Sequence, residues 1–245
     1  MEMFTEKEQI RYARQWVIPE IGEQGQEKLK RSHVLVAGIG GLGSLSSFYL
    51  TGLGIGHLTI VDCGSVQLSD LNRQILYNEK DLGLKKTDVA YEKLSFLNGD
   101  ISIEPISEEI TNRNIFKLIQ GVEIVIDGTD NFETRKVLNK ACFEKKIPYI
   151  YGGIFGFKGK MTTFIPGRTP CIECLYPKQE ERGSVVPVVG PIPGLIATLQ
   201  VLDALKLIIE FGHPLAGKLL SFDGETMAFN YFEIRKRPDC QICSA

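Results

Sequence analysis

The stretch HVLVAGIGGLGSLSSFYL, residues 33–50, decides the fold. Its first five residues form an apolar run that is typical of a buried strand, and a helix is expected over residues 42–53. The glycine cluster GIGGLG, residues 38–43, separates the two. Glycines permit a tight turn and a close approach of the backbone to a ligand, and the free amides at the start of a helix favour phosphate. This order of strand, glycine turn and helix predicts a nucleotide-binding site.

An acid completes this nucleotide pattern. The next apolar run, LTIVD at residues 58–62, ends on Asp62, 22 residues after Gly40. An acid at that position accepts hydrogen bonds from ribose hydroxyls. The pattern does not separate NAD from ATP, because a dehydrogenase fits it equally well. The glycines expected at the phosphates are Gly38, Gly40, Gly41 and Gly43.

Strand and helix patterns alternate from residue 33 to residue 153, which predicts βαβ units and a mostly parallel sheet. After Gly153 the pattern changes to strands of hairpin or meander type, with one long apolar helix expected over 192–211. The segment 5–30 reads as helical, with Gly22 and Gly25 as interruptions. The other expected helices cover 87–98, 112–119 and 133–146, and the other expected strands of the first half cover 101–107, 122–127 and 148–153.

The bulk composition is that of an ordinary soluble globule. Of the 245 residues, 43% are hydrophobic and 24% are charged, and the formal net charge is −2. So small a charge draws in neither nucleic acid nor an anionic membrane. The first residues lack the apolar core of a signal peptide, so we expect a cytoplasmic protein without nucleic-acid or membrane partners.

Charged residues follow the predicted strands. The segment SDLNRQ, residues 69–74, contains Arg73, and Lys86 and Asp130 follow it. Ligands of open α/β sheets lie outside the carboxyl ends of the strands, so Asp62 and Asp130 should share one crevice. Two cations would stabilise charge at an α-phosphate, and Asp130 could hold Mg²⁺. Two cations and an acid in this order favour ATP over a nicotinamide cofactor. The alternative is that Arg73 and Lys86 are ordinary surface charges.

Four of the six cysteines form two CxxC pairs, CIEC and CQIC. Each pair places two sulfurs on one metal, and four sulfurs make a closed tetrahedral zinc site. A redox role is the alternative, but two pairs favour metal. The remaining two, Cys63 and Cys142, are expected to be small buried residues. The expected zinc ligands are Cys171, Cys174, Cys240 and Cys243.

Together these motifs resemble the ThiF/MoeB/HesA family, the prokaryotic relatives of ubiquitin-activating enzymes. The resemblance extends from RYARQ at residue 11 to CQIC at residue 240 and includes GIGGLG, SDLNRQ, LGLKK, DGTDN and the helix VVGPIPGLIATLQVLDALK. It implies a Rossmann-like sheet extended by antiparallel strands. It also implies a homodimer that uses ATP to adenylate the C-terminal glycine of a small ubiquitin-like sulfur carrier, releasing pyrophosphate, in thiamin, molybdopterin or related synthesis.

The resemblance also assigns roles and boundaries. It places Asp62 at the ribose, Arg73 and Lys86 at the phosphates, and Asp130 at Mg²⁺. Arg14 in RYARQ matches an arginine that the family supplies to the partner subunit's site. The residues that would line the nucleotide are Ser69, Asp70, Leu71, Asn72, Arg73 and Asn131. A single adenylation domain is expected, with an N-terminal helical segment at 1–30, a nucleotide-binding half at 31–153 and a carrier-binding and zinc half at 154–245.

The chain departs from the family in one loop. Many members carry a reactive cysteine shortly before the region that matches VVPVVG, but residues 175–190 contain none. The polar segment KQEERGS, residues 178–184, is the expected mobile part of that loop. We therefore expect an acyl adenylate without a covalent carrier adduct through this loop.

Four other hypotheses remain open. Some relatives activate a peptide carboxylate, and others dehydrate a modified tRNA adenosine. The two CxxC pairs and the small net charge argue against a tRNA substrate. A NAD-dependent oxidoreductase is opposed by Arg73, Lys86 and the DGTDN match. A scaffold with a vestigial nucleotide site is opposed by the presence of Arg14 and Asp130 beside those two cations.

Overall fold

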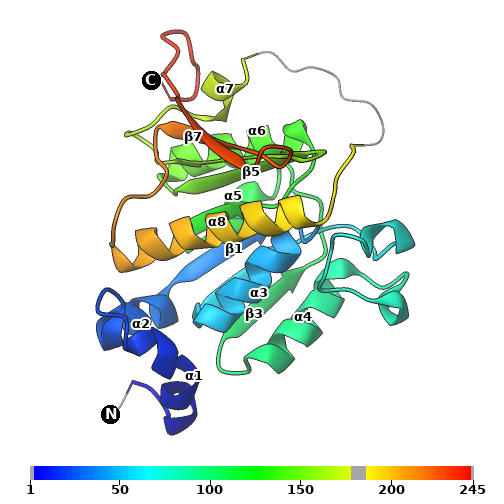
Figure 1. Ribbon diagram of the computed structural model, residues 1–245, viewed down its shortest axis with the longest axis vertical. Coiled ribbons are helices and arrows are strands. Elements are labelled where there is room, and N and C mark those ends of the chain that lie inside the picture. The colour runs from blue at the N-terminus through cyan, green and yellow to red at the C-terminus, as the bar shows by residue number, and fades with distance from the viewer. Residues whose placement is uncertain (1–2, 178–185, 244–245) are drawn as a thin grey trace.

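The computed structural model describes residues 3–177 and 186–243, so the prediction for KQEERGS lies outside the described residues. Eight strands form one sheet in the order β3-β2-β1-β4-β5-β6-β7-β8 (Figure 1). Neighbouring strands are parallel from β3 to β5 and antiparallel from β5 to β8. The expected parallel sheet with an antiparallel extension is confirmed.

The elements follow the predicted order. The strands are β1 (His33–Ala37), β2 (His57–Val61), β3 (Ser102–Ile106), β4 (Ile124–Asp127), β5 (Tyr149–Phe155), β6 (Lys158–Phe164), β7 (Lys218–Asp223) and β8 (Ala228–Glu233). The α-helices are α1 (Glu6–Trp16), α2 (Gly22–Arg31), α3 (Gly43–Leu53), α4 (Lys86–Leu97), α5 (Ile115–Leu118), α6 (Phe132–Lys145), α7 (Ile172–Leu175) and α8 (Pro191–Ile209). Two short 3₁₀ turns, Leu68–Asp70 and Glu79–Asp81, lie between β2 and α4.

Two expected details are wrong. Gly25 does not interrupt a helix; it lies inside α2, where a Cβ would approach the side chain of Ile21 to 3.2 Å and that of Ile209 to 3.6 Å. Its missing side chain therefore lets α2 pack closely. The helix expected over 112–119 is only α5, because Thr111 and Asn114 form a turn in which the Thr111 amide donates to Asn114 Oδ1 at 2.9 Å.

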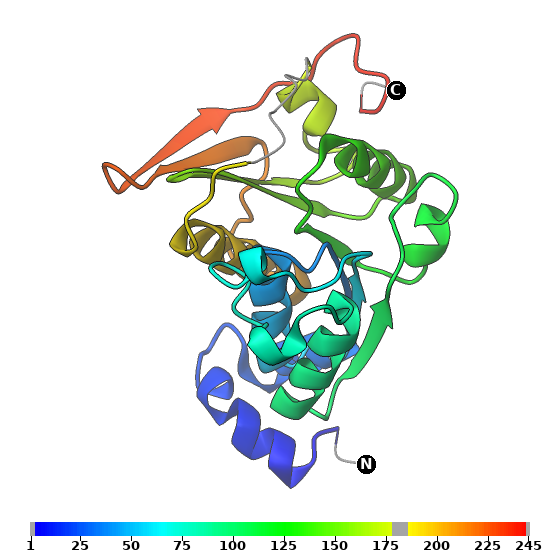
Figure 2. The same ribbon diagram turned by 90° about the vertical axis from the view of Figure 1, so that its right-hand side faces the viewer.

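Helices cover both faces of the sheet, and the sheet divides the core into two clusters (Figures 1 and 2). Side chains of a strand point alternately to opposite faces. In β1, Val34 and Val36 therefore pack in the cluster that contains α3, α4 and α8, whereas Leu35 and Ala37 pack in the cluster that contains α5 and α6. The apolar run of β1 follows from this, because both of its faces are buried.

Helix α8 is the long apolar helix predicted over 192–211. By length and composition it is long enough to cross a membrane, but half of its apolar window is buried inside this fold. It packs beside α3 and across β4, β5 and β6. Its hydropathy is therefore explained by its place in the core.

The strand order reverses between β1 and β4. From β1 the chain adds β2 and β3 on one side, and then β4 and β5 on the other. Ligands of open α/β sheets bind outside the carboxyl ends of the strands at such a reversal. The glycine turn after β1 and the DGTDN segment at the end of β4 meet at this point.

Candidate functional site

The glycine turn is packed against the loop that follows β4. Gly38 has a φ of +82°, and a Cβ there would lie 2.8 Å from the carbonyl oxygen of Gly128. A Cβ on Gly43 would lie 1.8 Å from the carbonyl oxygen of Gly38. By contrast, a Cβ on Gly40 would meet only Gln74 Nε2, at 3.7 Å, and one on Gly41 would meet side chains alone. The outer glycines thus set the fold of the turn, Gly40 leaves its surface open, and Gly41 lets Pro193 of α8 lie close, since a Cβ there would be 3.3 Å from Pro193 Cβ.

Asp62 anchors this turn. Its Oδ2 accepts a hydrogen bond from the Ile39 amide at 2.7 Å, and its Oδ1 accepts one from the Gly64 amide at 2.7 Å. The buried Tyr77 hydroxyl donates to the Ile39 carbonyl at 2.9 Å. Burial and the charges of Asp62 and Asp70 raise the pKa of Tyr77, so the hydroxyl stays a donor. The half-buried Asp62, which was predicted to bind the ribose, therefore holds the glycine turn in place.

Arg73 and Lys86 meet on one carboxylate. Asp70 Oδ1 lies 3.2 Å from Arg73 Nη2, and Asp70 Oδ2 lies 3.2 Å from Lys86 Nζ. Asp70 is only 6% exposed, and its carboxylate also accepts from the Gln67 amide and from Gln74 Nε2. The two predicted cations are therefore brought together beside the glycine turn by Asp70, which was itself predicted to line the nucleotide.

The neighbours of Asp70 have smaller roles. Arg73 Nη1 donates to the Ser69 carbonyl at 2.6 Å and to Asn72 Oδ1 at 3.0 Å, which fixes the guanidinium. Ser69 and Asn72 are exposed. Leu71 packs against the main core cluster, so its side chain faces inward.

A buried ion pair lies beneath the DGTDN segment, and sequence reasoning missed it. Asp127 is fully buried, and its Oδ2 accepts from Arg135 Nε and from the Tyr149 hydroxyl, each at 2.9 Å. Arg135 Nη2 donates to the Thr129 and Gly152 carbonyls at 2.6 and 3.0 Å. Burial alone would lower the pKa of Arg135, but the charge of Asp127 raises it. The one signal was an acid in the apolar strand VEIVID.

Asp130 and Asn131 follow this pair. Asp130 is exposed and makes no hydrogen bond or ion pair within residues 3–177 and 186–243. Asn131 caps α6, with its Oδ1 accepting from the Thr134 amide at 2.8 Å. Asp130 is therefore a free carboxylate at the end of β4, next to the turn after β1.

Arg14 lies away from these residues in its own chain. Helix α1 packs against the far ends of α3 and α4, where Gln15 donates to the Leu53 carbonyl and Arg11 donates to the Leu97 carbonyl. The 11 residues of α3 separate that end from the glycine turn, a distance of about 16 Å. Arg14 is exposed, so a neighbouring subunit could receive it.

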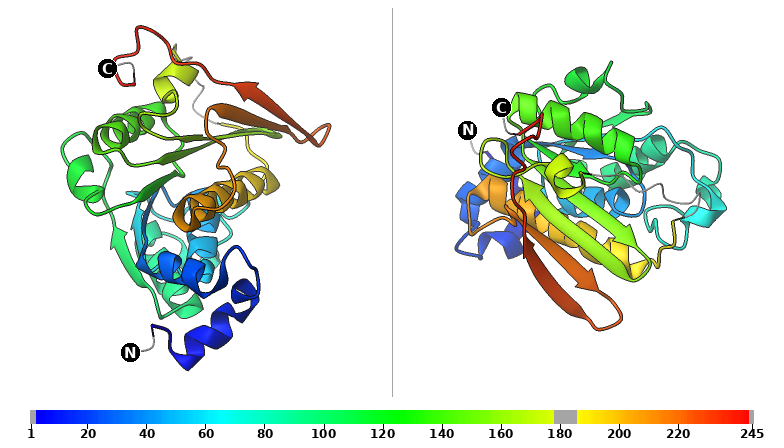
Figure 3. Two further views of the ribbon diagram at one scale, coloured as in Figure 1. Left: turned by 90° about the vertical axis from the view of Figure 1, so that its left-hand side faces the viewer. Right: turned by 90° about the horizontal axis from the view of Figure 1, so that it is seen from above.

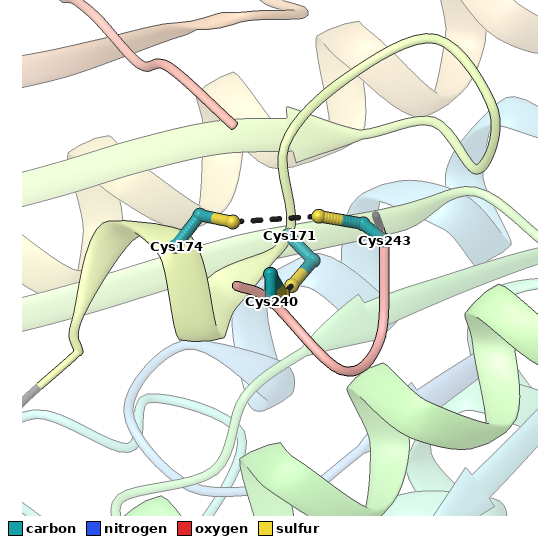
Figure 4. Close-up of side chains that lie close together, drawn as sticks. All are labelled: Cys171, Cys174, Cys240 and Cys243. Atoms are coloured by element: carbon teal, nitrogen blue, oxygen red, sulfur yellow. Dashed lines mark hydrogen bonds between the residues drawn. The ribbon is translucent and has the colours of Figure 1, made fainter. Parts of the chain in front are cut away.

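The four paired cysteines converge at the opposite end of the sheet (Figure 4). All four are buried, and their sulfurs lie within 4.8 Å of one another. The Sγ atoms of Cys171 and Cys240 are 3.6 Å apart, and those of Cys174 and Cys243 are 3.3 Å apart. Tetrahedral Zn²⁺ with bonds of about 2.3 Å places sulfurs about 3.8 Å apart, so the cluster fits a metal ion.

The other two cysteines differ from each other. Cys142 is fully buried, as expected, and burial raises the pKa of its thiol. The expectation that Cys63 is buried is wrong: it is exposed, because the chain has left β2 and entered the turn held by Asp62.

The carboxyl ends of β1 and β4 thus bring together the glycine turn, two cations and a free carboxylate. The cations would attract the phosphates of a nucleotide, and the amides at the start of α3 add partial positive charge. The arrangement suits stabilisation of charge on a phosphate more than covalent catalysis by the protein.

Comparison with known proteins agrees with this geometry. A model of the ThiF family matches residues 12–242. The chain is 37% identical over 238 residues to the SAMP-activating enzyme E1 of Haloferax volcanii, covering 95% of this chain and 88% of that one. It is 35% identical over 250 residues to the sulfur carrier protein adenylyltransferase of Thermus thermophilus, with coverages of 98% and 92%.

Two further proteins complete the comparison. The chain is 40% identical over 240 residues to the adenylyltransferase and sulfurtransferase MOCS3 of Culex quinquefasciatus; the match covers 96% of this chain but only 55% of that protein. A crystal structure of E. coli MccB with ATP superposes with a TM-score of 0.86 at 26% identity, covering 96% of this chain and 75% of that one.

Proposed function

The chain belongs to the ThiF family, and from this premise we propose that it is an ATP-dependent adenylyltransferase for a small ubiquitin-like sulfur carrier protein. The observation that carries the proposal is the pair of cations, Arg73 and Lys86, held together beside the open glycine turn. Hydride transfer to a nicotinamide does not require this pair of cations. The similarity to a sulfur carrier protein adenylyltransferase and to a SAMP-activating enzyme indicates the class of acceptor.

The reaction needs no covalent catalyst from the protein. A terminal glycine carboxylate oxygen of the carrier attacks the α-phosphorus of ATP, a new oxygen–phosphorus bond forms, and the bond to the β-phosphate breaks to release pyrophosphate. Two anions must be brought together while negative charge shifts toward the leaving group. Arg73 and Lys86 stabilise that charge, and the glycine turn positions the phosphates.

We assign the nucleotide to the crevice at the ends of β1 and β4. Asp62 binds the ribose, the glycine turn and segment 69–73 surround the phosphates, and Asn131 lies beside Asp130. Mg²⁺ is commonly bound through one or two carboxylates together with substrate phosphates, and the free carboxylate of Asp130 suits that role. When bound, Mg²⁺ would neutralise charge on the pyrophosphate.

Carrier-dependent ATP–pyrophosphate exchange tests this function. A carrier ending in Gly-Gly should support exchange, and removal of its last glycine should abolish it. Exchange with a short peptide alone would instead favour a peptide-activating enzyme, and NADH turnover without exchange would favour an oxidoreductase. The carrier is then identified by which candidate proteins support exchange, and its pathway follows from the carrier.

The antiparallel half is proposed to receive the carrier. Strand β8 forms the outer edge of the sheet (Figure 3), and it carries exposed aromatic side chains at Phe229, Tyr231 and Phe232. Phe155 and Phe157, at the β5–β6 hairpin, are also about half exposed. Exposed apolar surface of this kind is typical of a protein-binding site. We accordingly divide the chain into an N-terminal helical segment at 1–30, a nucleotide-binding half at 31–153 and a carrier-binding and zinc half at 154–245.

We also propose that the protein works in the cytoplasm.

A homodimer is part of the proposal. The outward faces of α3 and α8 are apolar, with Phe48, Tyr49 and Leu202 each at least 40% exposed, and α1 holds Arg14 away from its own crevice. A second copy covering α3 and α8 would bury this surface and bring Arg14 to the other subunit's nucleotide.

Mixed dimers test this arrangement. Arg14→Ala and Lys86→Ala should each be inactive in exchange when expressed alone. When the two are co-expressed, half of the dimers are mixed and each contains one intact site, so about a quarter of wild-type activity should return. Co-expression of Lys86→Ala with Asp130→Ala, two residues of one chain's own crevice, should restore none. Equal results for the two mixtures would contradict donation of Arg14 between subunits.

We propose that the four-cysteine cluster binds structural Zn²⁺. Purified protein should then contain about one zinc ion per chain, and Cys240→Ser should contain none. The variant should lose about 4 kcal/mol in the free energy of unfolding, the stabilisation given by a ligand at 1,000 times its Kd. Cys63→Ser, which removes an exposed thiol outside the cluster, should keep both zinc and stability. Iron in place of zinc, or no metal, would overturn the assignment.

A further inference from the structure

Asp70 is the only acidic side chain in the described parts of the chain that contacts both Arg73 and Lys86. Each of its oxygens accepts two hydrogen bonds or ion pairs: Oδ1 from Arg73 and Gln74, and Oδ2 from Lys86 and Gln67. Four donors occupy the four lone-pair positions of a carboxylate. Asp70 therefore has no free position for a ribose hydroxyl or a metal ion.

This geometry places one negative charge inside the phosphate site. The side chains of Arg73 and Lys86 are 28% and 13% exposed, so they can reach a ligand while Asp70 stays buried behind them. With Asp70 ionised, the two cations present a net charge of about +1 to an incoming phosphate instead of +2. At separations near 4 Å in a partly buried site, one charge changes an electrostatic interaction substantially.

We propose that Asp70 is an internal counter-anion that weakens the binding of ATP phosphates and of pyrophosphate, so that the product leaves. The inference rests on the proposed adenylation function. Asp70 orients the two cations through its ion pairs and competes with phosphate for them. An uncompensated pair of cations would hold the highly charged pyrophosphate more tightly, and product release limits many enzymes.

Binding of inorganic pyrophosphate to the full-length protein tests the proposal without requiring any carrier. Asp70→Asn keeps the size of the side chain and removes its charge. Calorimetric titration at fixed Mg²⁺ and ionic strength should give about tenfold tighter binding than wild type. In the adenylation assay, pyrophosphate should then inhibit this variant at about a tenth of the concentration. Asp70→Glu, which keeps the charge but lengthens the side chain, should not bind pyrophosphate more tightly than wild type.

Asp81→Asn is the matched control. Asp81 is likewise a buried aspartate of the segment between β2 and α4, but it pairs with Lys93. The substitution Asp81→Asn changes the net charge of the protein by the same amount as Asp70→Asn, and it should leave the affinity for pyrophosphate unchanged. If Asp70→Asn does not fold, as judged by its thermal transition, Asp70→Ser makes the same measurement with the same expected direction.

The outcomes separate the inference from the function. If Asp70→Asn binds pyrophosphate no more tightly than wild type, or more weakly, Asp70 is a nucleotide ligand or a structural group and the inference is wrong, although adenylation stands. If Asp81→Asn tightens binding equally, only net charge matters and the inference is also wrong. If wild type binds neither ATP nor pyrophosphate, the function itself fails.

Discussion

Asp130→Ala is expected to lower carrier-dependent ATP–pyrophosphate exchange by about 10²–10³-fold, which corresponds to about 3–4 kcal/mol of transition-state stabilisation. The carboxylate of Asp130 is exposed and makes no hydrogen bond or ion pair within residues 3–177 and 186–243, so it does not stabilise the fold. Its removal should therefore change the free energy of unfolding by less than about 0.5 kcal/mol. Exchange kinetics and a denaturant titration on the same preparation measure both quantities.

Glu133→Ala provides the control for Asp130. Glu133 is an exposed acid three residues further along, and its partner is Lys136 on the same helix. Removing it changes the net charge equally but touches no proposed ligand, so exchange should stay within about twofold of wild type. Full exchange activity in Asp130→Ala would refute the magnesium assignment, and equal losses in both variants would reduce it to an effect of net charge.

Asp127→Asn is expected to destabilise the protein by about 3–5 kcal/mol, because it leaves the guanidinium of Arg135 buried without its counter-charge. Both side chains are at most 5% exposed, so water cannot replace the lost carboxylate. For a domain of this size such a loss lowers the unfolding midpoint by about 10 °C. Because Thr129 also bonds to Asp127, the DGTDN segment should loosen and exchange activity should fall.

The pair between Glu133 and Lys136 on the same helix is a natural comparison for this ion pair. Its side chains are 80% and 41% exposed, and Glu133→Gln should cost no more than about 1 kcal/mol. Urea titration of the two variants would show the contrast. If Asp127→Asn lost as little as Glu133→Gln, the buried pair would contribute nothing beyond an ordinary surface contact.

The parts of this fold that sequence predicted are those in which local pattern and packing agree. The strand of residues 33–37 was predicted with its bounds because both of its faces are buried, and α8 because its apolar run is long. The CxxC pairs indicated a four-sulfur cluster because spacing alone brings two sulfurs together. Arg73 and Lys86 were expected near the glycine turn from their order in the chain after Asp62 and from the family resemblance.

What sequence missed depends on partners that are distant along the chain. Nothing local shows that Asp127 pairs with Arg135 and Tyr149, which come from α6 and β5. The ion pairs of Asp70 with both cations were also missed, because one partner, Lys86, comes from α4. Cys63 was expected to be buried because it follows an apolar strand, yet the turn begins there. Such partners are set by tertiary packing, which no periodicity encodes.

The close contact of three glycines has a consequence for engineering. The carbonyl oxygen of Gly38 lies where a methyl group on Gly43 would be 1.8 Å away and one on Gly128 would be 2.4 Å away. A library that seeks a new nucleotide or carrier specificity should therefore keep these positions fixed, since any side chain there would displace the backbone of the glycine turn or of the loop after β4. Diversity belongs instead at Ser69, which is exposed and bonds to Arg73 through its backbone carbonyl, whereas the side chain of Asn72 holds the Arg73 guanidinium and should be kept.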